Sequence, residues 1–477
     1  MSLTTRLAIY DPQLLTEDDF LRGFIARRPC LERQGRHILN DINATLTRHR
    51  LIIGQRGMGK TALLRRVAIA VRDNKALHQH WIPLSFREEQ YNIAQLQQLW
   101  ANCADALSDW CEDQQDRDSM DQLRRACDAA EPLWPVIQAV ADKHQRRLLL
   151  LVDNLQLILD NLSDADQWAW RDALQARNGP MLLACSPTLP SQLTDRDGAF
   201  YEFFSLETLR ELTAAELHSH LRTLADNRGD AGHRVHTQLD QHPQRVDVLH
   251  TLCGGSPRTL TLIYHVLEQL PDQPTPGIAQ VLEAVLEHAT PLYKARTEAL
   301  SPQQRRIVDA IGLHWDPTHS SAIHQATGLA PSNISPQIKR LEEDGLIDKV
   351  PLDGKRKGYQ LVERSYATWY LMRHGNRRTR KRLHALAEFL EHYHSTQALA
   401  PHARQLLTHG STPEAIRNAE HAYRDALDAH PKDANTWDAL GNLHMDCLKD
   451  ATAARDAWQT AINADPKTPS PHKNRAC

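Results

Sequence analysis

One short segment combines the residue types and the spacing, G-x-x-x-x-G-K-[ST], of a loop that binds phosphate groups: Gly54-Gln55-Arg56-Gly57-Met58-Gly59-Lys60-Thr61. Glycines at positions 54 and 59 let the backbone turn tightly, so that successive N–H groups can point inward at phosphate oxygens. The Lys60 ammonium can reach the β- and γ-phosphates of a nucleotide, and the Thr61 hydroxyl can ligate Mg²⁺. The segment therefore predicts a nucleotide site.

The flanking residues place this loop between a strand and a helix. Leu51-Ile52-Ile53 is a short apolar run before the loop, and residues 61–71 carry apolar side chains at helical spacing. The N-terminus of such a helix directs its partial positive charge at bound phosphate. In this context the segment is identified as the phosphate-binding loop of P-loop NTPases. The alternative, a glycine-rich turn before an unrelated helix, does not account for the strand that precedes it.

A second segment with candidate site residues is the apolar run 148–152, which ends at Asp153 and Asn154. Such a run is typical of a central parallel strand, buried on both faces, with its carboxyl end at the site. It resembles a Walker B segment, in which Asp153 would hold Mg²⁺. Many related ATPases carry a second acid directly after the Mg²⁺ aspartate, where this chain has Asn154. The side-chain amide of Asn154 can orient a water molecule but cannot accept its proton. We therefore expect slow hydrolysis, or binding with little turnover.

The other apolar runs complete an α/β P-loop NTPase core, a parallel sheet flanked by helices, over residues 1–210. Further strands are expected at 81–86, 181–186 and 199–209, and helices at 91–110, 131–141 and 168–176, with a charged loop at 112–121. A polar residue at the tip of the 181–186 strand is where AAA+ proteins place a γ-phosphate sensor. Ser186 or Thr188 occupies that position.

Two segments outside the sheet resemble nucleotide-contacting segments of the AAA+ and STAND branches. The segment that ends at Arg27 resembles one that lines the adenine pocket. In the predicted helical lid, residues 211–300, Gly255, Pro257 and Arg258 resemble the G-x-P motif of STAND and Orc/Cdc6-like ATPases, where the arginine serves as a second sensor. An ordinary helix start and a generic turn are the alternatives. Together, residues 20–290 resemble a STAND/AAA+ module, close to archaeal-ATPase-like members.

Residues 301–385 resemble a winged helix-turn-helix. Three expected helices, at 301–313, 320–327 and 332–347, precede a hairpin at 348–362 with a basic tip. Double-stranded DNA could be contacted by the third helix and by this tip, through Asn333, Lys339, Lys355, Arg356 and Lys357. The alternative is a regulatory arm that packs on the ATPase core and binds no DNA, as winged helices often do in STAND proteins.

The last predicted domain, residues 386–477, is an all-α tail that resembles tetratricopeptide repeats. One stretch follows the pattern with Trp437, Leu440, Gly441, His444, Ala454, Trp458, Ala461 and Pro466, and Ala419, Tyr423, Ala426 and Pro431 match half a repeat before it. A stable solenoid needs about three repeats. We therefore expect the tail to pack on preceding helices or to bind a protein partner. Amphipathic helices of no particular family are the alternative.

Composition is that of a soluble, multidomain protein: 477 residues, 41% hydrophobic and 24% charged. A formal net charge of −3 gives no global attraction to nucleic acid. No apolar run reaches the length of a membrane span and no signal peptide is recognisable, so we expect a cytoplasmic protein without membrane contact. The eight cysteines include no C-x-x-C pair, which favours reduced thiols over disulfides or a zinc site.

These features favour a signal-transducing switch of the STAND/AAA+ type that binds ATP or ADP with Mg²⁺. Its conformation, or its assembly into a homo-oligomer, would depend on the nucleotide, and its tail would recruit a protein. The alternative is an Orc/Cdc6-like initiator or transcription regulator, in which ATP gates DNA binding through the winged helix. A third hypothesis, a scaffold with an inactive nucleotide site, rests on Asn154 alone.

Overall fold

The computed structural model describes residues 15–44, 46–86, 93–270, 276–352, 357–391 and, with short gaps, 420–464. The chain divides into two compact units, each made of three segments. Unit 1 comprises Met1–His236, Cys253–Leu270 and Val285–Gly375, and unit 2 comprises Thr237–Leu252, Pro271–Ala284 and Asn376–Cys477. The domain limits expected from the sequence, at 210, 300 and 385, stay predictions.

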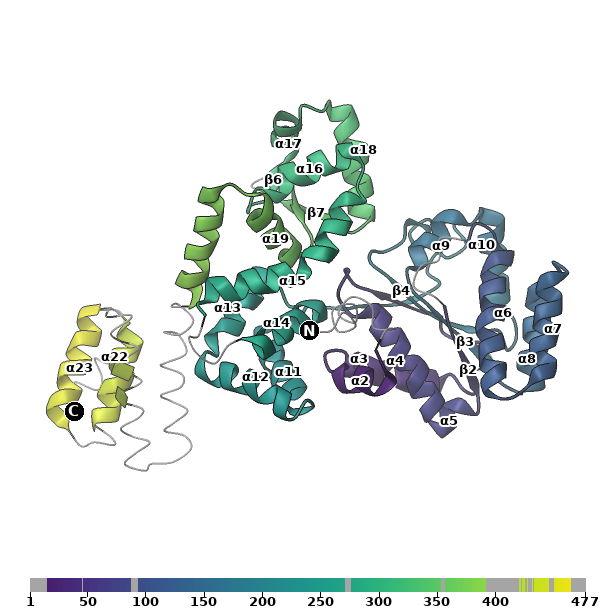
Figure 1. Cartoon of the computed structure of the whole chain (residues 1–477), viewed down its shortest axis with the longest axis horizontal. Helices are drawn as coiled ribbons and strands as arrows, with labels where there is room; N and C mark the ends of the chain where they lie inside the picture. Colours follow the sequence, from purple (N-terminus) through teal and green to yellow (C-terminus); the bar gives the residue numbers. More distant parts are fainter. Residues whose placement is uncertain are drawn as a thin grey trace. The chain divides into compact units, whose positions relative to one another are not determined.

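The centre of unit 1 is a five-stranded parallel sheet in the order β2-β3-β4-β1-β5 (Figure 1). Its strands are β1 (Arg50–Ile53), β2 (Trp81–Ser85), β3 (Arg147–Val152), β4 (Met181–Ser186) and β5 (Ser205–Thr208). Because all five run the same way, their carboxyl ends meet at one edge of the sheet. The expected phosphate loop follows β1 and Asp153 follows β3, so that only β4 separates the two strands.

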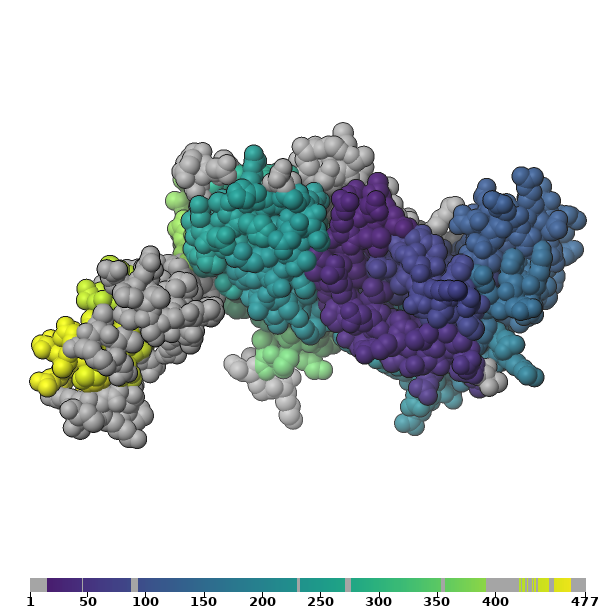
Figure 2. All heavy atoms as spheres, turned by 90° about the horizontal axis from the view of Figure 1, so that it is seen from below, coloured from purple at the N-terminus to yellow at the C-terminus, as the bar shows by residue number. Residues whose placement is uncertain are grey.

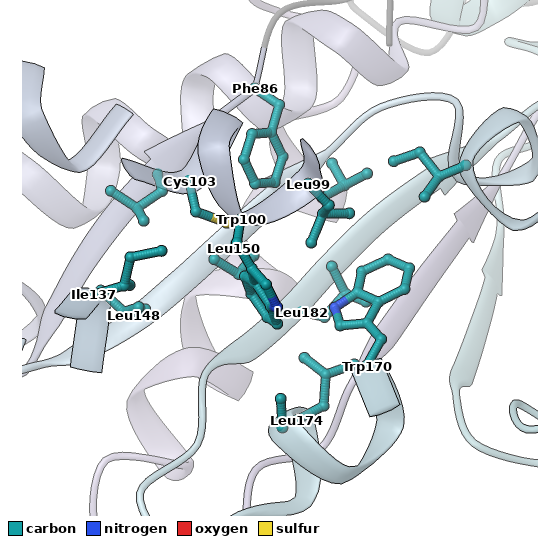
Figure 3. Close-up of a cluster of buried hydrophobic side chains, with 14 of the residues drawn as sticks. Phe86, Leu99, Trp100, Cys103, Ile137, Leu148, Leu150, Trp170, Leu174 and Leu182 are labelled. Atoms are coloured by element: carbon teal, nitrogen blue, oxygen red, sulfur yellow. The ribbon is translucent and has the colours of Figure 1, made fainter. Parts of the chain in front are cut away.

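Alternate residues of the strands enter two apolar clusters on opposite faces of the sheet. On one face, Leu150 and Leu182 pack against Trp100 and Trp170 from flanking helices (Figure 3). On the other face, Leu149 and Leu183 join residues of the helix after the phosphate loop and of the two N-terminal helices. Burial on both faces is the reason why these strands read as continuous apolar runs.

The helices around the sheet begin with α2 (Glu17–Gly23), α3 (Arg28–Asn40), α4 (Lys60–Asp73) and α5 (Lys75–His78). In Figure 2 the N-terminal helices, in purple, form part of the surface of unit 1. The opposite face carries α6 (Leu96–Asp113), α7 (Arg117–Asp128), α8 (Leu133–Lys143), α9 (Leu155–Asn161) and α10 (Asp164–Gln175), and a 3₁₀ turn, η2 (Ser191–Leu193), follows β4.

Two local predictions were wrong. The segment 112–121 was expected to be a loop, yet α7 begins within it, because Asp116 caps the helix by accepting from the Ser119 amide and Leu123 is buried. Residues 199–204 are not part of the last strand, which is confined to β5. There, Phe200 is buried and packs edge-on against Trp170, so these aromatic residues fill the core instead of extending the sheet.

The sheet is followed by helices that carry the expected lid motif: α11 (Ala214–Asp226), α12 (Asp230–Gln241), α13 (Gln244–Cys253), α14 (Pro257–Gln269) and α15 (Ile278–Glu298). A capping box begins α11, with reciprocal bonds between Thr213 and Glu216. Ser256 caps α14 by accepting from the Thr259 amide, and Pro257 occupies the first helical position.

Residues 301–375 combine helices with a small antiparallel sheet in the order β6-β8-β7. Its elements are α16 (Pro302–Gly312), β6 (Thr318–His319), α17 (Ser320–Thr327), α18 (Pro331–Glu343), β7 (Ile347–Pro351), β8 (Lys357–Leu361) and α19 (Arg364–His374). Gly328 ends α17 in the left-handed region at φ 65°. Of the expected basic hairpin tip, Lys355 and Arg356 lie outside the described residues.

Unit 2 is helical in its described residues. Residues 377–391 form a helix, and the C-terminal part contains α22 (Ala434–Leu443) and α23 (Ala451–Ala464). Within this unit, Arg245 pairs with Glu391 at 2.7 Å from Nε to Oε1. None of the helices in the described ranges combines the length and the apolar character that crossing a membrane requires.

Candidate functional site at the phosphate loop

The loop between β1 and α4 adopts a conformation that depends on its glycines. Gly57 and Gly59 have φ values of +85° and +81°, a region that other residues adopt only under strain. Gly54 is needed for close packing, because a Cβ atom there would lie 3.1 Å from the Leu209 Cβ. The Gly54 amide also donates to the Ser186 carbonyl oxygen at 3.1 Å, which fastens the loop to the end of β4.

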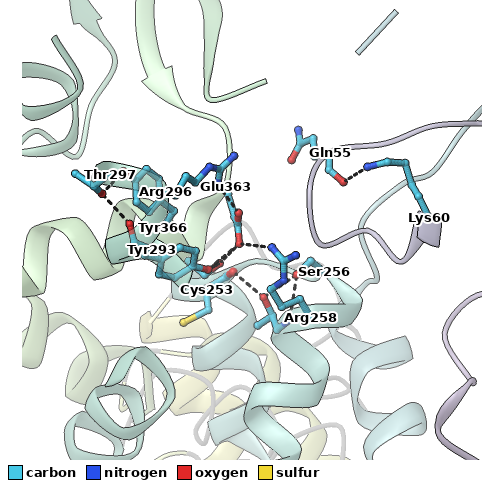
Figure 4. A network of polar contacts seen from close by, with 12 residues as sticks. Gln55, Lys60, Cys253, Ser256, Arg258, Tyr293, Arg296, Thr297, Glu363 and Tyr366 are labelled. Carbon is cyan, nitrogen blue, oxygen red and sulfur yellow. Dashed lines mark hydrogen bonds and ion pairs between the residues drawn. The ribbon is translucent and has the colours of Figure 1, made fainter. Parts of the chain in front are cut away.

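Lys60 and Gly59 give this loop groups that can bind an anion. The Lys60 side chain is buried, and its ammonium donates to the carbonyl oxygens of Gly54 at 2.6 Å and Gln55 at 3.1 Å (Figure 4). Burial lowers the pKa of Lys60, and the positive charges of Arg258 and Arg56 add to that effect. Gly59 begins α4 without a side-chain cap, so the first N–H groups of the helix remain available to a phosphate.

The structure brings Thr61 and Asp153 into direct contact, although they are far apart in sequence. The Thr61 hydroxyl donates to Asp153 Oδ2, and the Asp153 side chain is buried. A hydroxyl and a carboxylate are hard oxygen ligands of the kind that Mg²⁺ prefers. Asn154 follows with left-handed backbone angles, φ 52° and ψ 46°, and its amide donates to Asp153 Oδ1 at 2.8 Å. The backbone of Asn154 thus orients the neighbouring carboxylate.

The polar residues after β4 face two different parts of unit 1. The Ser186 hydroxyl is buried and donates to the Thr188 carbonyl oxygen at 2.5 Å, while Gln156 Oε1 lies 3.1 Å from the same hydroxyl oxygen. The Thr188 hydroxyl donates to the Glu343 carbonyl oxygen at 3.2 Å, at the end of α18. The tip of β4 therefore links the sheet edge that carries the loop to residues 301–375.

Arg27 lies against the loop. Its side chain is buried, and Nε donates to the Met58 carbonyl oxygen at 2.9 Å. A Cβ atom on Gly59 would lie 3.6 Å from the Arg27 Cγ. The N-terminal segment therefore reaches the phosphate loop from outside the sheet.

Pro257 and Arg258 reach the same loop from α14. A Cβ atom on Gly59 would lie 3.6 Å from the Pro257 Cγ, and the Arg258 amide donates to the Gly57 carbonyl oxygen at 3.2 Å. A Cβ atom on Gly57 would lie 3.1 Å from Arg258 Nη1. The segments around Arg27 and Arg258 are far apart in the sequence. Both thus lie against the glycines of the loop.

Sequence reasoning missed a buried carboxylate, Glu363, which lies beyond Arg258 (Figure 4). Its Oε2 accepts from Arg296 at 2.9 Å, its Oε1 accepts from the Tyr293 hydroxyl at 2.7 Å, and Arg258 Nη1 lies 3.9 Å from Oε1. Burial raises the pKa of the Tyr293 hydroxyl, and the Glu363 charge adds to it. No spacing in the sequence marks Glu363, because its partners lie on α14 and α15.

These residues fit a nucleotide with Mg²⁺ by the chemistry of their donors. The loop would hold phosphate oxygens through its backbone N–H groups and through Lys60, while Thr61 and Asp153 would hold the metal ion. Mg²⁺ bound there would neutralise charge on the phosphate oxygens. Arg258 supplies a further positive charge beside the loop.

Away from the loop, one group among the described residues has side chains that can bind metals. Ligand atoms of Cys111, Asp116 and His144 lie within 4.8 Å of one another. However, Lys143 Nζ lies 2.9 Å from both Asp116 oxygens, and His144 Nε2 lies 2.8 Å from one of them. Burial raises the pKa of Cys111 to about 11, with a further contribution from Asp116. The group is explained as the charge-satisfied N-terminal cap of α7.

Comparison with known families identifies one part of the chain. Residues 48–193, which include the loop and Asp153, match the model of the NACHT domain. The chain carries a NACHT-type P-loop NTPase domain. Nucleotide binding with Mg²⁺ is the property that this class of domain implies. A search of curated proteins finds no match.

The chain is similar in fold to a solved structure of an Orc protein. The ORC2 protein of Aeropyrum pernix, in ADPNP and ADP complexes, aligns with a TM-score of 0.50 at 16% identity, over 80% of this chain and 97% of that chain. The ORC1 protein of the same organism, in complex with DNA, gives a TM-score of 0.44 at 12% identity, with coverage of 75% and 92%. RuvB of Thermotoga maritima gives 0.35 at 14% identity, with coverage of 71% and 93%.

Proposed function

We propose that this protein is a signal-transducing switch that binds ATP or ADP with Mg²⁺ and changes conformation or assembly state with the nucleotide. The observation that carries the proposal is the convergence of Arg27, Asp153 and Arg258 on the glycine-rich loop around Lys60. Adenine is the proposed base because the similar ORC2 structure was determined with ADPNP and ADP.

A switch requires that the two nucleotides bind two conformations with different affinity. Lys60 and Arg258 are the groups that can supply this difference, because a terminal phosphate adds negative charge beside both. Slow hydrolysis belongs to the same proposal, because Asn154 can orient a water molecule but cannot take its proton. A long-lived triphosphate state suits a switch better than a motor.

The experiment is light scattering of the full chain with ADP, with ATP and Mg²⁺, and without nucleotide. We expect a larger assembly with ATP and Mg²⁺ only, and its loss in Lys60→Ala. The matched control is Lys75→Ala, which removes an exposed lysine of α5. Calorimetric titration comes first: if neither ADP nor ATP binds the wild-type protein, the nucleotide part of the proposal is wrong. If both bind and the mass never changes, assembly is wrong.

A second candidate function is DNA binding through the winged-helix-like residues 301–375. Asn333 and Lys339 are exposed on α18, and Lys357 is exposed at the start of β8. Lys339 lies 3.6 Å from Glu343, a surface pair that leaves its ammonium accessible. The test is duplex binding at increasing salt concentration: phosphate contacts predict a steep loss of affinity, which Lys357→Ala would make shallower. Binding that does not depend on salt would exclude this candidate.

Recruitment of a protein by the C-terminal helices is the remaining part of the proposal. The tetratricopeptide-like residues Gly441 and Trp458 do pack together, since a Cβ atom on Gly441 would overlap the Trp458 indole at Nε1. A repeat of this kind cannot bury its apolar face alone. We propose that a protein partner, or a second copy of the chain in the assembled state, covers this face.

A further inference from the structure

Glu363 occupies the point where the lid arginine meets residues 301–375. It lies between β8 and α19, and its side chain is 8% exposed. Arg258 Nη1 lies 3.9 Å from its Oε1 on one side, and on the other side it would lie 3.1 Å from a Cβ atom added to Gly57. Arg258 therefore stands between a fixed carboxylate and the loop that binds phosphate (Figure 4).

The bonds of Glu363 differ in strength. Arg296 and Tyr293 donate to it at 2.9 Å and 2.7 Å, which are ordinary hydrogen-bond lengths, whereas the 3.9 Å separation from Arg258 is an ion pair without a hydrogen bond. Arg296 alone can thus compensate the charge of Glu363. Loss of the Arg258 contact would not leave a buried carboxylate unpaired, which is the expensive outcome in a protein interior.

We infer that Glu363 is a positioning residue that competes with the terminal phosphate of a bound nucleoside triphosphate for Arg258. Without that phosphate, Arg258 stays with Glu363 and ties the loop to residues 301–375. When the terminal phosphate is bound, Arg258 pairs with that phosphate and its contact with Glu363 is lost. This inference rests on the proposed nucleotide binding and deepens it, because it names Arg258 and Glu363 as the groups whose interaction differs between bound triphosphate and bound diphosphate.

The test compares two affinities of the full chain, one for ADP and one for adenylyl imidodiphosphate, which is an analogue of the triphosphate. Both are measured by calorimetry with Mg²⁺. Glu363→Gln keeps the shape and removes the competing charge. We expect it to raise triphosphate affinity relative to diphosphate affinity by about two- to fivefold, the range that measured ion pairs support. A general change in electrostatic potential also favours the more negatively charged triphosphate, so the change in the ratio is compared with that of a control variant that removes another nearby carboxylate charge.

Three further variants separate positioning from a structural role. Glu363→Asp keeps the charge and should return the ratio toward the wild-type value. In an Arg258→Gln background, Glu363→Gln should no longer change the ratio, because the group for which it competes is gone. Glu211→Gln is the matched control, since Glu211 accepts from the Gly255 amide beside the same turn.

The outcomes are distinct from those of the proposed function. If wild-type protein binds both nucleotides and Glu363→Gln leaves their ratio unchanged, the inference is wrong while nucleotide binding stands. The inference is also wrong if Glu211→Gln changes the ratio as much as Glu363→Gln does. If Glu363→Gln does not fold, Tyr293→Phe removes one of the two hydroxyl groups that donate to Glu363 Oε1 and leaves Ser365 at 3.2 Å. The less neutralised oxygen should then hold Arg258 more strongly and lower triphosphate affinity relative to diphosphate affinity instead. If nothing binds the wild-type protein, the proposed function itself fails.

Discussion

The amide nitrogen of Arg258 lies 3.2 Å from the carbonyl oxygen of Gly57, so the first turn of α14 is hydrogen-bonded to the phosphate loop itself. Gly57 is also the residue whose missing side chain makes room for the Arg258 guanidinium. A phosphate that changes the backbone at Gly57 therefore acts directly on the hydrogen bond that holds the first turn of α14. No intermediate residue is needed to carry the effect from the loop to the lid.

Gly57→Ala tests this contact. An alanine at φ +85° costs about 1–2 kcal/mol, and its Cβ would press on Arg258 Nη1 at 3.1 Å. We expect ADP affinity to fall about tenfold, measured by calorimetric titration. The control is Gly35→Ala in α3, where a Cβ atom meets nothing within 4 Å. Equal ADP affinity in the two variants would contradict the conformation assigned to the loop.

Asn154→Asp should accelerate hydrolysis. A carboxylate can accept the proton of an attacking water molecule, which an amide cannot, and general-base catalysis contributes about 10²-fold or more. Aspartate also tolerates the left-handed backbone observed at this position. Phosphate release under single-turnover conditions measures the effect. Asn161→Asp, an exposed position at the end of α9, should leave the rate unchanged. A rate no higher in Asn154→Asp would mean that another group limits hydrolysis.

Gly441→Ala should destabilise the α22–α23 pair. The new Cβ atom would overlap the Trp458 side chain at Nε1, so the indole has to move, and overpacking of this kind costs about 1–3 kcal/mol. Thermal unfolding followed by tryptophan fluorescence should show a lower midpoint for unit 2. In the same unit, Gly277→Ala meets nothing within 4 Å and serves as the control. An unchanged midpoint would argue against the packing of these two helices.

His49 should make unit 1 less stable at mildly acid pH. Burial, with the Arg147 charge, lowers its pKa to about 4, and its Nδ1 accepts from the Leu182 amide at 3.2 Å. The unfolded chain binds a proton near pH 6.5 and the folded chain does not. Stability is therefore lost as pH falls from about 6.5 to about 4, by about 1 kcal/mol at pH 5.5. Urea unfolding at pH 7.5 and 5.5 measures this.

The matched variant for that measurement is His49→Asn, which keeps an acceptor for the Leu182 amide and cannot be protonated. Its midpoint should fall less between the two pH values than that of the wild-type protein. If both midpoints fall equally, the acid sensitivity comes from other groups.

The sheet and the loop could be predicted because their signals are local. A strand buried on both faces must be apolar throughout, as the run from Leu148 to Val152 is, and the phosphate loop depends on glycines at fixed spacing. The resemblance of Arg27 and Arg258 to nucleotide-contacting residues identified side chains that the fold does bring to the loop. Their roles in binding stay predictions.

The rest depended on contacts between distant parts of the chain. The aromatic residues near Phe200 have the composition of a strand, yet Phe203 stacks on His49 at 4.5 Å and fills a space that only the folded sheet creates. The function of Glu363 could not be predicted from the sequence either, because an acidic residue before a helix is typical of an ordinary helix start. Its importance comes from Arg296 and Arg258, which lie 67 and 105 residues before it in the sequence.

The interleaving of the two units has a consequence for shortened forms of the protein. Unit 2 takes its first two segments from within the lid, so a chain that stopped after Gly375 would keep those segments and lose their partners. Arg245, which is 6% exposed, would lose the carboxylate of Glu391, which is the ion-pair partner of its buried guanidinium. A chain that ends before Glu391 is therefore expected to destabilise residues 237–252, and truncations intended to isolate the NTPase core should also remove or replace residues 237–252 and 271–284.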